Sequence, residues 1–155
     1  MYKRELLKMG KITKSNQKII LFIVCMNCMF VLFVMPKYKQ YILIDYQERL
    51  IINTIERAIS YFEEYERAEE EFYLGELRDE LFILSRMYTQ LEDIAQYETS
   101  FYMELSWVCS ILESKSSNLR NLEYIKRGLD MLKVNIYCET PMFLEFYNSN
   151  YVNKN

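Results

Sequence analysis

The longest unbroken run of apolar positions in the chain extends from Ile19 to Met35. None of its seventeen residues is charged, and only Asn27 is clearly polar. As a helix the run would be about 26 Å long, and the hydrocarbon core of a bilayer is about 30 Å thick. A soluble helix is normally apolar on one face only. The pattern therefore predicts a transmembrane helix over residues 19–35.

A cleaved signal peptide and a buried core helix are the alternatives to a transmembrane helix. A signal peptide has an apolar core of about 7–15 residues followed by a small-x-small cleavage site, which the residues after Val34 do not provide. Lys18 and Lys37 bracket the run, and their long side chains can reach the headgroups from a short span. Tyr38 and Tyr41 fall where aromatic rings favour the membrane interface. We therefore expect an uncleaved signal anchor.

Basic residues are concentrated before the apolar run. Residues 1–18 contain six Lys or Arg and one Glu, which gives this tail a charge of +5. The chain as a whole carries −3, so the remainder carries −8. An excess of Lys and Arg stays on the cytoplasmic side of a membrane. We therefore expect a single-pass protein of the plasma membrane, with a cytoplasmic N-terminus and an extracytoplasmic C-terminal domain.

Downstream of the span, apolar residues recur at helical spacing. Steps of three and four residues from Tyr41 to Phe72 meet mostly apolar or aromatic side chains, which predicts a long helix over residues 37–74. Leu74-Gly75 would end it, because glycine is favoured just past a helix. Similar periodicity predicts helices over residues 76–96, 101–115 and 119–137. Gly128 would cost the last helix about 1 kcal/mol relative to Ala, and it marks a close helix crossing.

Short loops between these helices predict antiparallel neighbours and an all-α fold. We expect one N-terminal transmembrane helix, then a long stalk helix and an antiparallel bundle of about four helices. The predicted parts are a basic cytoplasmic tail (1–18), a transmembrane helix (19–35), a juxtamembrane helical stalk (36–52), a helical bundle (53–138) and an aromatic-rich C-terminal tail (139–155). Three Gly and two Pro are too few turn-formers for a many-stranded sheet.

The C-terminal tail begins with Thr140-Pro141, which is typical of a helix cap followed by proline at the first helical position. The aromatic residues after it are hard to place in the predicted core, and exposed aromatic clusters tend to bind partners. Phe143, Phe146 and Tyr147 are therefore the candidate partner-binding residues of the tail. Asn27 is a further candidate, since its amide can bond to a second membrane helix. A tolerated single polar residue is the alternative for Asn27.

The residue types on which much enzyme chemistry depends are missing. There is no histidine, which removes His-based nucleophile pairs and His metal ligands. Three widely separated glycines cannot form a phosphate-binding loop. Cys25 and Cys28 form a C-x-x-C string, but it lies inside the apolar run, where thiolates are disfavoured. Cys109 and Cys138 are expected to be free thiols. We expect no enzyme activity, no cofactor and no metal.

The charge of the part after the span narrows the choice of partners. An acidic domain argues against nucleic acid as a ligand. Its acidic residues gather between Glu63 and Glu80, where they either solvate a helix end or bind divalent cations or a basic partner. The expected partners are the lipid bilayer and either a membrane or envelope protein or a second copy of the chain.

These patterns favour a non-enzymatic scaffold or accessory subunit of a bacterial envelope complex, acting through protein–protein contacts. The Lys-, Ile-, Asn- and Tyr-rich composition suggests an AT-rich bacterial genome. The layout is broadly similar to that of small bitopic envelope proteins, but no residue motif assigns the chain to one family. The alternative is an extracytoplasmic sensor bundle that binds a ligand and signals through a partner membrane protein. A buried polar residue such as Arg57 or Arg86 beside an internal cavity would favour that alternative. Four aromatic residues either pack in the core, as aromatic residues at helical spacing usually do, or line a small-molecule pocket: Trp107, Phe101, Tyr102 and Tyr88.

Overall fold

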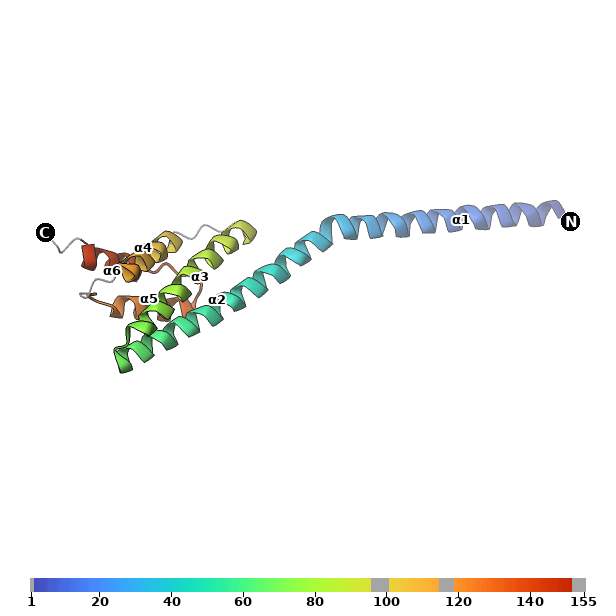
Figure 1. The fold of residues 1–155 in the computed structure, drawn as a ribbon. Coiled ribbons are helices and arrows are strands. Elements are labelled where there is room, and N and C mark those ends of the chain that lie inside the picture. Colours follow the sequence, from blue (N-terminus) through green and yellow to red (C-terminus); the bar gives the residue numbers. More distant parts are fainter. Residues whose placement is uncertain (1, 96–100, 115–118, 152–155) are drawn as a thin grey trace. The chain divides into compact units, whose positions relative to one another are not determined.

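The computed structural model describes residues 2–95, 101–114 and 119–151, with side-chain surroundings for residues 16–95, 103–114 and 119–151. Regular structure in these residues is entirely helical, which confirms the predicted all-α fold. The helices are α1 (Tyr2–Met29), the π-helix η1 (Phe30–Val34), α2 (Met35–Ala68), α3 (Glu71–Ala95), α4 (Phe101–Glu113), α5 (Glu123–Val134) and α6 (Met142–Tyr151) (Figure 1). The predicted short loops at residues 97–100 and 116–118 lie outside the described residues.

The chain divides into two compact units, Met1–Ile42 and Leu43–Asn155. We call the second unit the bundle. It begins ten positions earlier than the predicted boundary at residue 53, because Gln47 and Ile51 are buried in it. The Gln47 amide donates to the Met87 carbonyl at 3.3 Å and to Oε1 of Gln90 at 3.2 Å. The C-terminal part of the predicted stalk, from Leu43 on, thus belongs to the bundle, and Gln47 and Ile51 are its buried residues.

The first unit contains the apolar run, and its side chains lie on the surface. Every residue from Ile19 to Met35 is exposed. The continuous helix that contains the run has an 18-residue apolar window. None of this window is buried within the described structure. A helix that is apolar on all sides needs an apolar environment around it. By its length and composition this helix could span a membrane.

The π-helix η1 lies directly before Pro36. The Met35 N–H donates to the Phe30 carbonyl, which is the five-residue bond of a π turn. Proline has no N–H, and its ring clashes with the carbonyl four residues earlier, here that of Leu32. Bulges and kinks are the usual ways in which a helix accommodates these two effects. Helical structure therefore continues through Pro36.

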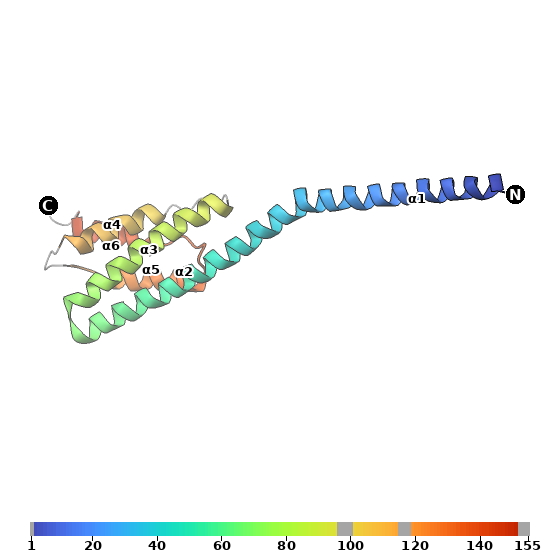
Figure 2. The same ribbon diagram turned by 45° about the vertical axis from the view of Figure 1, so that its right-hand side comes forward.

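The turn between α2 and α3 lies at Glu69–Glu70, so the predicted helix end at Leu74-Gly75 is wrong (Figures 1 and 2). Glu69 has a positive φ of 53°, and its N–H donates to the Tyr65 carbonyl at 2.8 Å. This conformation costs a non-glycine residue about 1–2 kcal/mol. Gly75 lies within α3 without a positive φ, and Phe72, predicted on the buried seam, is exposed.

Packing explains why the turn falls where it does. The buried positions of the two helices are mirror images about residues 69 and 70. Ile51, Ile55, Ala58 and Phe62 of α2 correspond to Tyr88, Leu84, Leu81 and Leu77 of α3, and all eight are buried. Arg57 and Glu80 pair across the same hairpin, with bonds of 2.8 and 3.0 Å. A turn at Gly75 would place these stripes out of register, so the gain from burial outweighs the local preference for glycine.

Helix α5 is shorter than the predicted helix over residues 119–137. Asn121 has a positive φ of 55°, which asparagine adopts more readily than most residues. At the other end Asn135 is extended, and its side-chain oxygen accepts the backbone N–H of Tyr137 at 3.0 Å. Asparagine side chains compete with helical bonds in this way. Both limits of α5 are therefore set by asparagines.

Helices α4, α5 and α6 complete the bundle. Helix α4 packs on α3, and α6 packs on both α4 and α5 (Figure 2). Lys133 of α5 pairs with Glu56 of α2 at 3.3 Å. Inside the core, the Tyr88 hydroxyl donates to the Ile136 carbonyl at 2.9 Å, and burial raises the pKa of Tyr88. Tyr88 therefore stays a neutral donor and ties α3 to the segment after α5.

Within the predicted C-terminal tail, residues 142–151 form α6 of the bundle, and the predicted exposure of Phe143 and Phe146 is wrong. Both side chains are 0% exposed. The ring of Phe143 lies over Gly128, where an added Cβ would be 2.8 Å from Cζ of the ring. The predicted close helix crossing at Gly128 is thus confirmed. Thr140, the predicted cap, is buried, and its hydroxyl has no partner among the described residues.

The bundle cysteines are free thiols in the structure, as predicted. Cys109 is buried, and burial raises its pKa from 9 to about 12. Because the thiolate is the nucleophile, we expect Cys109 to react with a maleimide at pH 8 at least about 100-fold more slowly in the folded protein than after denaturation. Peptide mass spectrometry of timed samples measures this. The raised pKa also means that the thiol's contribution to stability is complete below pH 9 and is lost as the pH rises towards 12.

Equal labelling rates at Cys109 before and after denaturation would contradict its burial. Cys138 serves as the internal comparison, since it is only half-buried and its pKa is raised by the same cause. We expect Cys138 to react faster than Cys109 in the folded protein.

Candidate interaction surface

Three aromatic rings form a row across α4 and α6, in which one pair is tilted and the other stacked. The ring centroids of Trp107 and Tyr147 are 5.2 Å apart with an interplanar angle of 38°, and those of Tyr147 and Tyr151 are 4.8 Å apart at 22°. Four-residue spacing puts the two tyrosines on one face of α6. Trp107 is 39% exposed and Tyr151 is 52% exposed, whereas Tyr147 between them is half-buried. We call these residues the aromatic row.

Two further apolar side chains extend the aromatic row. Met103 lies one turn before Trp107 on α4, and Leu144 lies one turn before Tyr147 on α6; both are exposed. Single exposed apolar residues are ordinary on protein surfaces, but contiguous groups mark contact sites. Tryptophan and tyrosine also dominate the residues that contribute most to protein–protein binding. The aromatic row with Met103 and Leu144 is hereafter the aromatic surface.

The spacing of apolar residues in α4 already indicated that Trp107 lies outside the buried face of the helix. Between residues 103 and 113 of α4, the buried residues are Leu105, Val108, Cys109 and Ile111. Trp107 does not belong to this series, so the pattern already placed it at the edge of the core. The sequence interpretation assigned Trp107 to core packing because aromatic residues usually are buried. Its stacking partner could not be identified, since Tyr147 lies forty residues further along the chain.

The other predicted site residues lie in the first unit. Lys18, Lys37, Tyr38 and Tyr41 are all exposed on the helices that flank or follow the apolar run. Asn27 is exposed in the middle of that run, and its side-chain N–H donates to the Ile23 carbonyl at 2.8 Å. Their roles at a membrane stay predictions.

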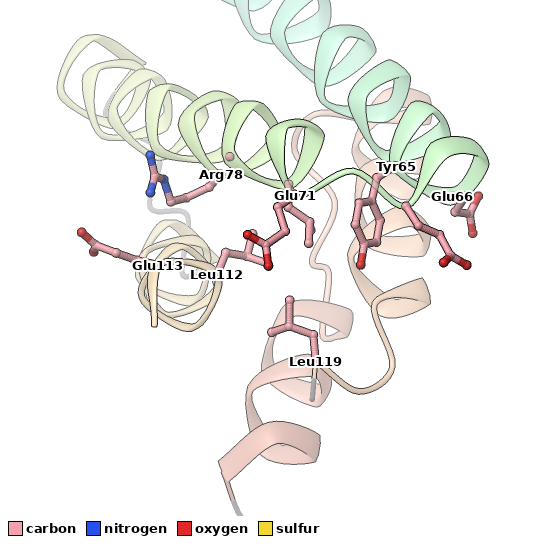
Figure 3. Close-up of a pocket in the computed structure, with 10 residues that line it drawn as sticks. Tyr65, Glu66, Glu71, Arg78, Leu112, Glu113 and Leu119 are labelled. Carbon is pink, nitrogen blue, oxygen red and sulfur yellow. The ribbon is translucent and has the colours of Figure 1, made fainter. Parts of the chain in front are cut away.

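An open pocket of about 620 Å³ lies at the α2–α3 turn, where the acidic residues gather (Figure 3). It is lined by Tyr65, Glu66, Glu69, Glu71, Leu74, Gly75, Arg78, Leu112, Glu113 and Leu119. Arg78 pairs with its neighbour Asp79 at 2.6 Å, and this pairing raises the pKa of the guanidinium. In the described part of the chain, no group of three or more Cys, Asp or Glu residues is suited to a metal ion. The contacts seen are those of a solvated helix end.

The residues proposed for a ligand-binding core are not arranged around a cavity. Arg57 lies on the surface, where its guanidinium forms the bidentate pair with Glu80, and this hydrogen bonding raises its pKa. Arg86 is exposed, with its guanidinium 4.6 Å from the centre of the Phe82 ring. Tyr88 is fully buried, whereas Trp107 lies on the surface. These four residues therefore do not form a common pocket, and the side chains of Phe101 and Tyr102 lie outside the described part of the chain.

No protein-family model matches the chain, and comparison with curated proteins and with solved structures gave no match.

The pKa shifts of the bundle are those of groups in a packed core. Among the described residues, burial raises the pKa values of Tyr88, Glu104, Cys109 and Cys138. Activation of a thiol or phenol as a nucleophile requires the opposite shift. The geometry of the aromatic surface is suited to binding.

Proposed function

We propose that the chain is a single-pass, membrane-anchored interaction protein that serves as a scaffold or accessory subunit of an envelope complex. Residues 19–35 anchor it in the plasma membrane, the N-terminus is cytoplasmic, and the bundle is extracytoplasmic. The observation that carries the proposal is the aromatic row, whose three neighbouring rings are held partly exposed on the bundle. The partner is a membrane or envelope protein that covers this row.

The anchor is supported by exposure and charge together. An apolar helix of this length with all its side chains exposed is unfavourable in water, because each buried CH₂ is worth about 0.8 kcal/mol. The bilayer removes that cost. The +5 charge of residues 1–18 favours the cytoplasmic side.

The partner contact is supported by the composition around the aromatic row. Ser106 and Ser110 of α4 and Asn148 of α6 are exposed polar residues near the rings along these helices. An aromatic centre within a polar rim is the ordinary anatomy of a protein–protein interface. Rings already packed against each other lose little conformational entropy when a partner covers them.

Co-purification of the full-length protein in mild detergent tests the contact. We expect the wild-type protein to retain a stoichiometric partner and the double variant Trp107→Ala/Tyr151→Ala to lose it, with at least about a tenfold drop in affinity, since such residues typically contribute 1–2 kcal/mol or more each. Phe72→Ala is the matched control, because Phe72 is an exposed aromatic residue at the α2–α3 turn. Far-UV circular dichroism checks that each variant is folded.

Two outcomes would contradict the proposed contact. One is a partner that both variants retain equally. The other is a wild-type protein that purifies as a monomer with no partner under conditions that keep other envelope complexes intact.

Labelling with a membrane-impermeant thiol reagent tests the topology. Val134→Cys is a suitable reporter, because Val134 is 89% exposed and lies at the end of α5. Native Cys138 is a poorer reporter, since burial raises its pKa. We expect the new cysteine to react on intact cells. Reaction only after permeabilisation would place the bundle on the cytoplasmic side and overturn the proposed orientation.

A further inference from the structure

The apolar run carries a stripe of β-branched residues with one amide in it. Ile20, Val24, Asn27 and Val31 are separated by four, three and four residues. At 3.6 residues per turn, Ile20, Val24 and Asn27 of α1 fall within a sector of about 60° on the helix surface. Val31 follows Asn27 at a spacing of four residues and lies in η1. Elsewhere the run holds mainly Leu, Met, Phe and Cys. We call these four residues the Asn27 stripe.

The Asn27 stripe is exposed along its whole length. The Asn27 amide uses one N–H for its bond to the Ile23 carbonyl. An asparagine side chain offers a second N–H and an acceptor oxygen, and the described contacts show no partner for that oxygen. In a hydrocarbon environment water does not supply one, so an unpaired amide there is unfavourable.

We propose that two copies of the chain associate side by side in the membrane as a parallel dimer through the Asn27 stripe, with the two Asn27 amides bonded to each other. This proposal rests on the membrane anchoring proposed above. It names the homotypic contact of the span, which is separate from the contact made by the aromatic surface.

The depth of Asn27 in the membrane and the chemistry of its amide both favour a second copy of the chain as the partner of the Asn27 stripe. A copy inserted in the same direction places its own Asn27 at the same depth without further adjustment. The amide is also self-complementary, since it donates through N–H and accepts through its oxygen. A two-fold axis through the contact satisfies both groups at once.

The other residues of the stripe suit close helix packing. Ile and Val are restricted at χ1 in a helix, so they lose little rotamer freedom when a neighbouring helix covers them. The spacing of four, three and four residues is that of the seam between two left-handed supercoiled helices. A polar residue at one seam position selects the register and the number of helices.

Cysteine cross-linking in native membranes tests the contact. In full-length protein whose four cysteines are replaced by alanine, single cysteines are placed on the stripe (Val24→Cys or Val31→Cys) or on the opposite face (Phe22→Cys or Met29→Cys). Mild oxidation is expected to give disulfide-linked dimers several-fold more strongly from the stripe positions. Equal yields at all four positions, or adducts with a different membrane protein alone, would overturn the proposal.

Moving the amide is the second test. Asn27→Val should lower the dimerisation constant measured in dilution experiments by about 3- to 30-fold, which is the range expected for one interhelical amide contact. Asn27→Met/Met29→Asn keeps the composition but places the amide on the opposite face, so it should not restore the dimer. A dimer fraction unchanged in both variants would overturn the role of Asn27.

Alkaline carbonate extraction separates the two proposals. A chain that is extracted overturns the membrane anchor itself. A chain that resists extraction but gives no stripe-specific cross-link leaves the anchor standing and overturns the dimer alone.

Discussion

Replacing Phe143 by Ala is expected to lower the free energy of unfolding of the bundle by about 3–5 kcal/mol. The ring is fully buried between α5 and α6, so its removal loses both transfer free energy and packing contacts. Urea denaturation of the full-length protein in mild detergent measures this. The fluorescence of Trp107, the single tryptophan, and far-UV circular dichroism both report the transition.

Leu144→Ala is the matched control for Phe143→Ala. Leu144 is the next residue on α6 and is 38% exposed, so its truncation should cost no more than about 1 kcal/mol. Equal losses for the two variants would contradict the burial of Phe143. If Phe143→Ala does not fold, Phe143→Leu gives a smaller cavity and the same comparison can be made.

The position of Phe143 also bears on binding. Phe143 and Phe146 hold α6 against the bundle, and the same helix carries Tyr147 and Tyr151 of the aromatic row. Loss of the buried ring should therefore weaken the partner contact, even though Phe143 itself cannot touch a partner.

Gly128→Ala is expected to destabilise the bundle by about 1–3 kcal/mol, which is the usual cost of overpacking. Helix propensity alone predicts the opposite sign, since Ala is better than Gly by about 1 kcal/mol in a helix interior. The close approach of Phe143 makes the substitution destabilising, because the new methyl group would meet the Phe143 ring at 2.8–2.9 Å. The same urea titration measures the difference.

Gly75→Ala is the matched control for Gly128→Ala. Gly75 also lies within a helix, but an added Cβ there would meet no atom within 4 Å. This variant should therefore gain up to about 1 kcal/mol from helix propensity. Equal responses at the two glycines would contradict the proposed steric origin.

A double-mutant cycle then assigns the clash to the ring. In a Phe143→Leu background, Gly128→Ala should cost less or become stabilising, with a coupling free energy of about 0.5–3 kcal/mol. If the effects of Gly128→Ala and Phe143→Leu on the free energy of unfolding were additive, Phe143 would not be the residue that the new methyl group displaces.

Helix type and the buried faces were predictable from local pattern. The spacing of Ile51, Ile55, Ala58 and Phe62 identified the core stripe of α2, and that of Leu77, Leu81 and Leu84 identified the stripe of α3. The turn between them was not predictable, because Gly75 is locally the better helix stop. Its position at Glu69–Glu70 follows from matching one stripe to the other, which local preferences do not contain.

The aromatic surface was likewise predictable from local pattern only in part. The sequence singled out Tyr147, and the structure places it in the middle of the aromatic row. It also singled out Phe143 and Phe146, which the structure buries. Three- and four-residue spacing puts these aromatics on adjoining faces of a ten-residue helix. It cannot distinguish a helix that packs on its own bundle from one that packs on another protein.

The sequence by itself determined the properties that depend on composition and local periodicity. These are the apolar run that could span a membrane, the helical character of the chain, and the contrast between a basic tail and an acidic domain. Tertiary structure alone decided the α2–α3 turn, the docking of α6 and the meeting of Trp107 with Tyr147. The physical reason is that an apolar stripe indicates only which face of a helix is buried. The surface that buries this face is selected by the free energy of the whole packed bundle.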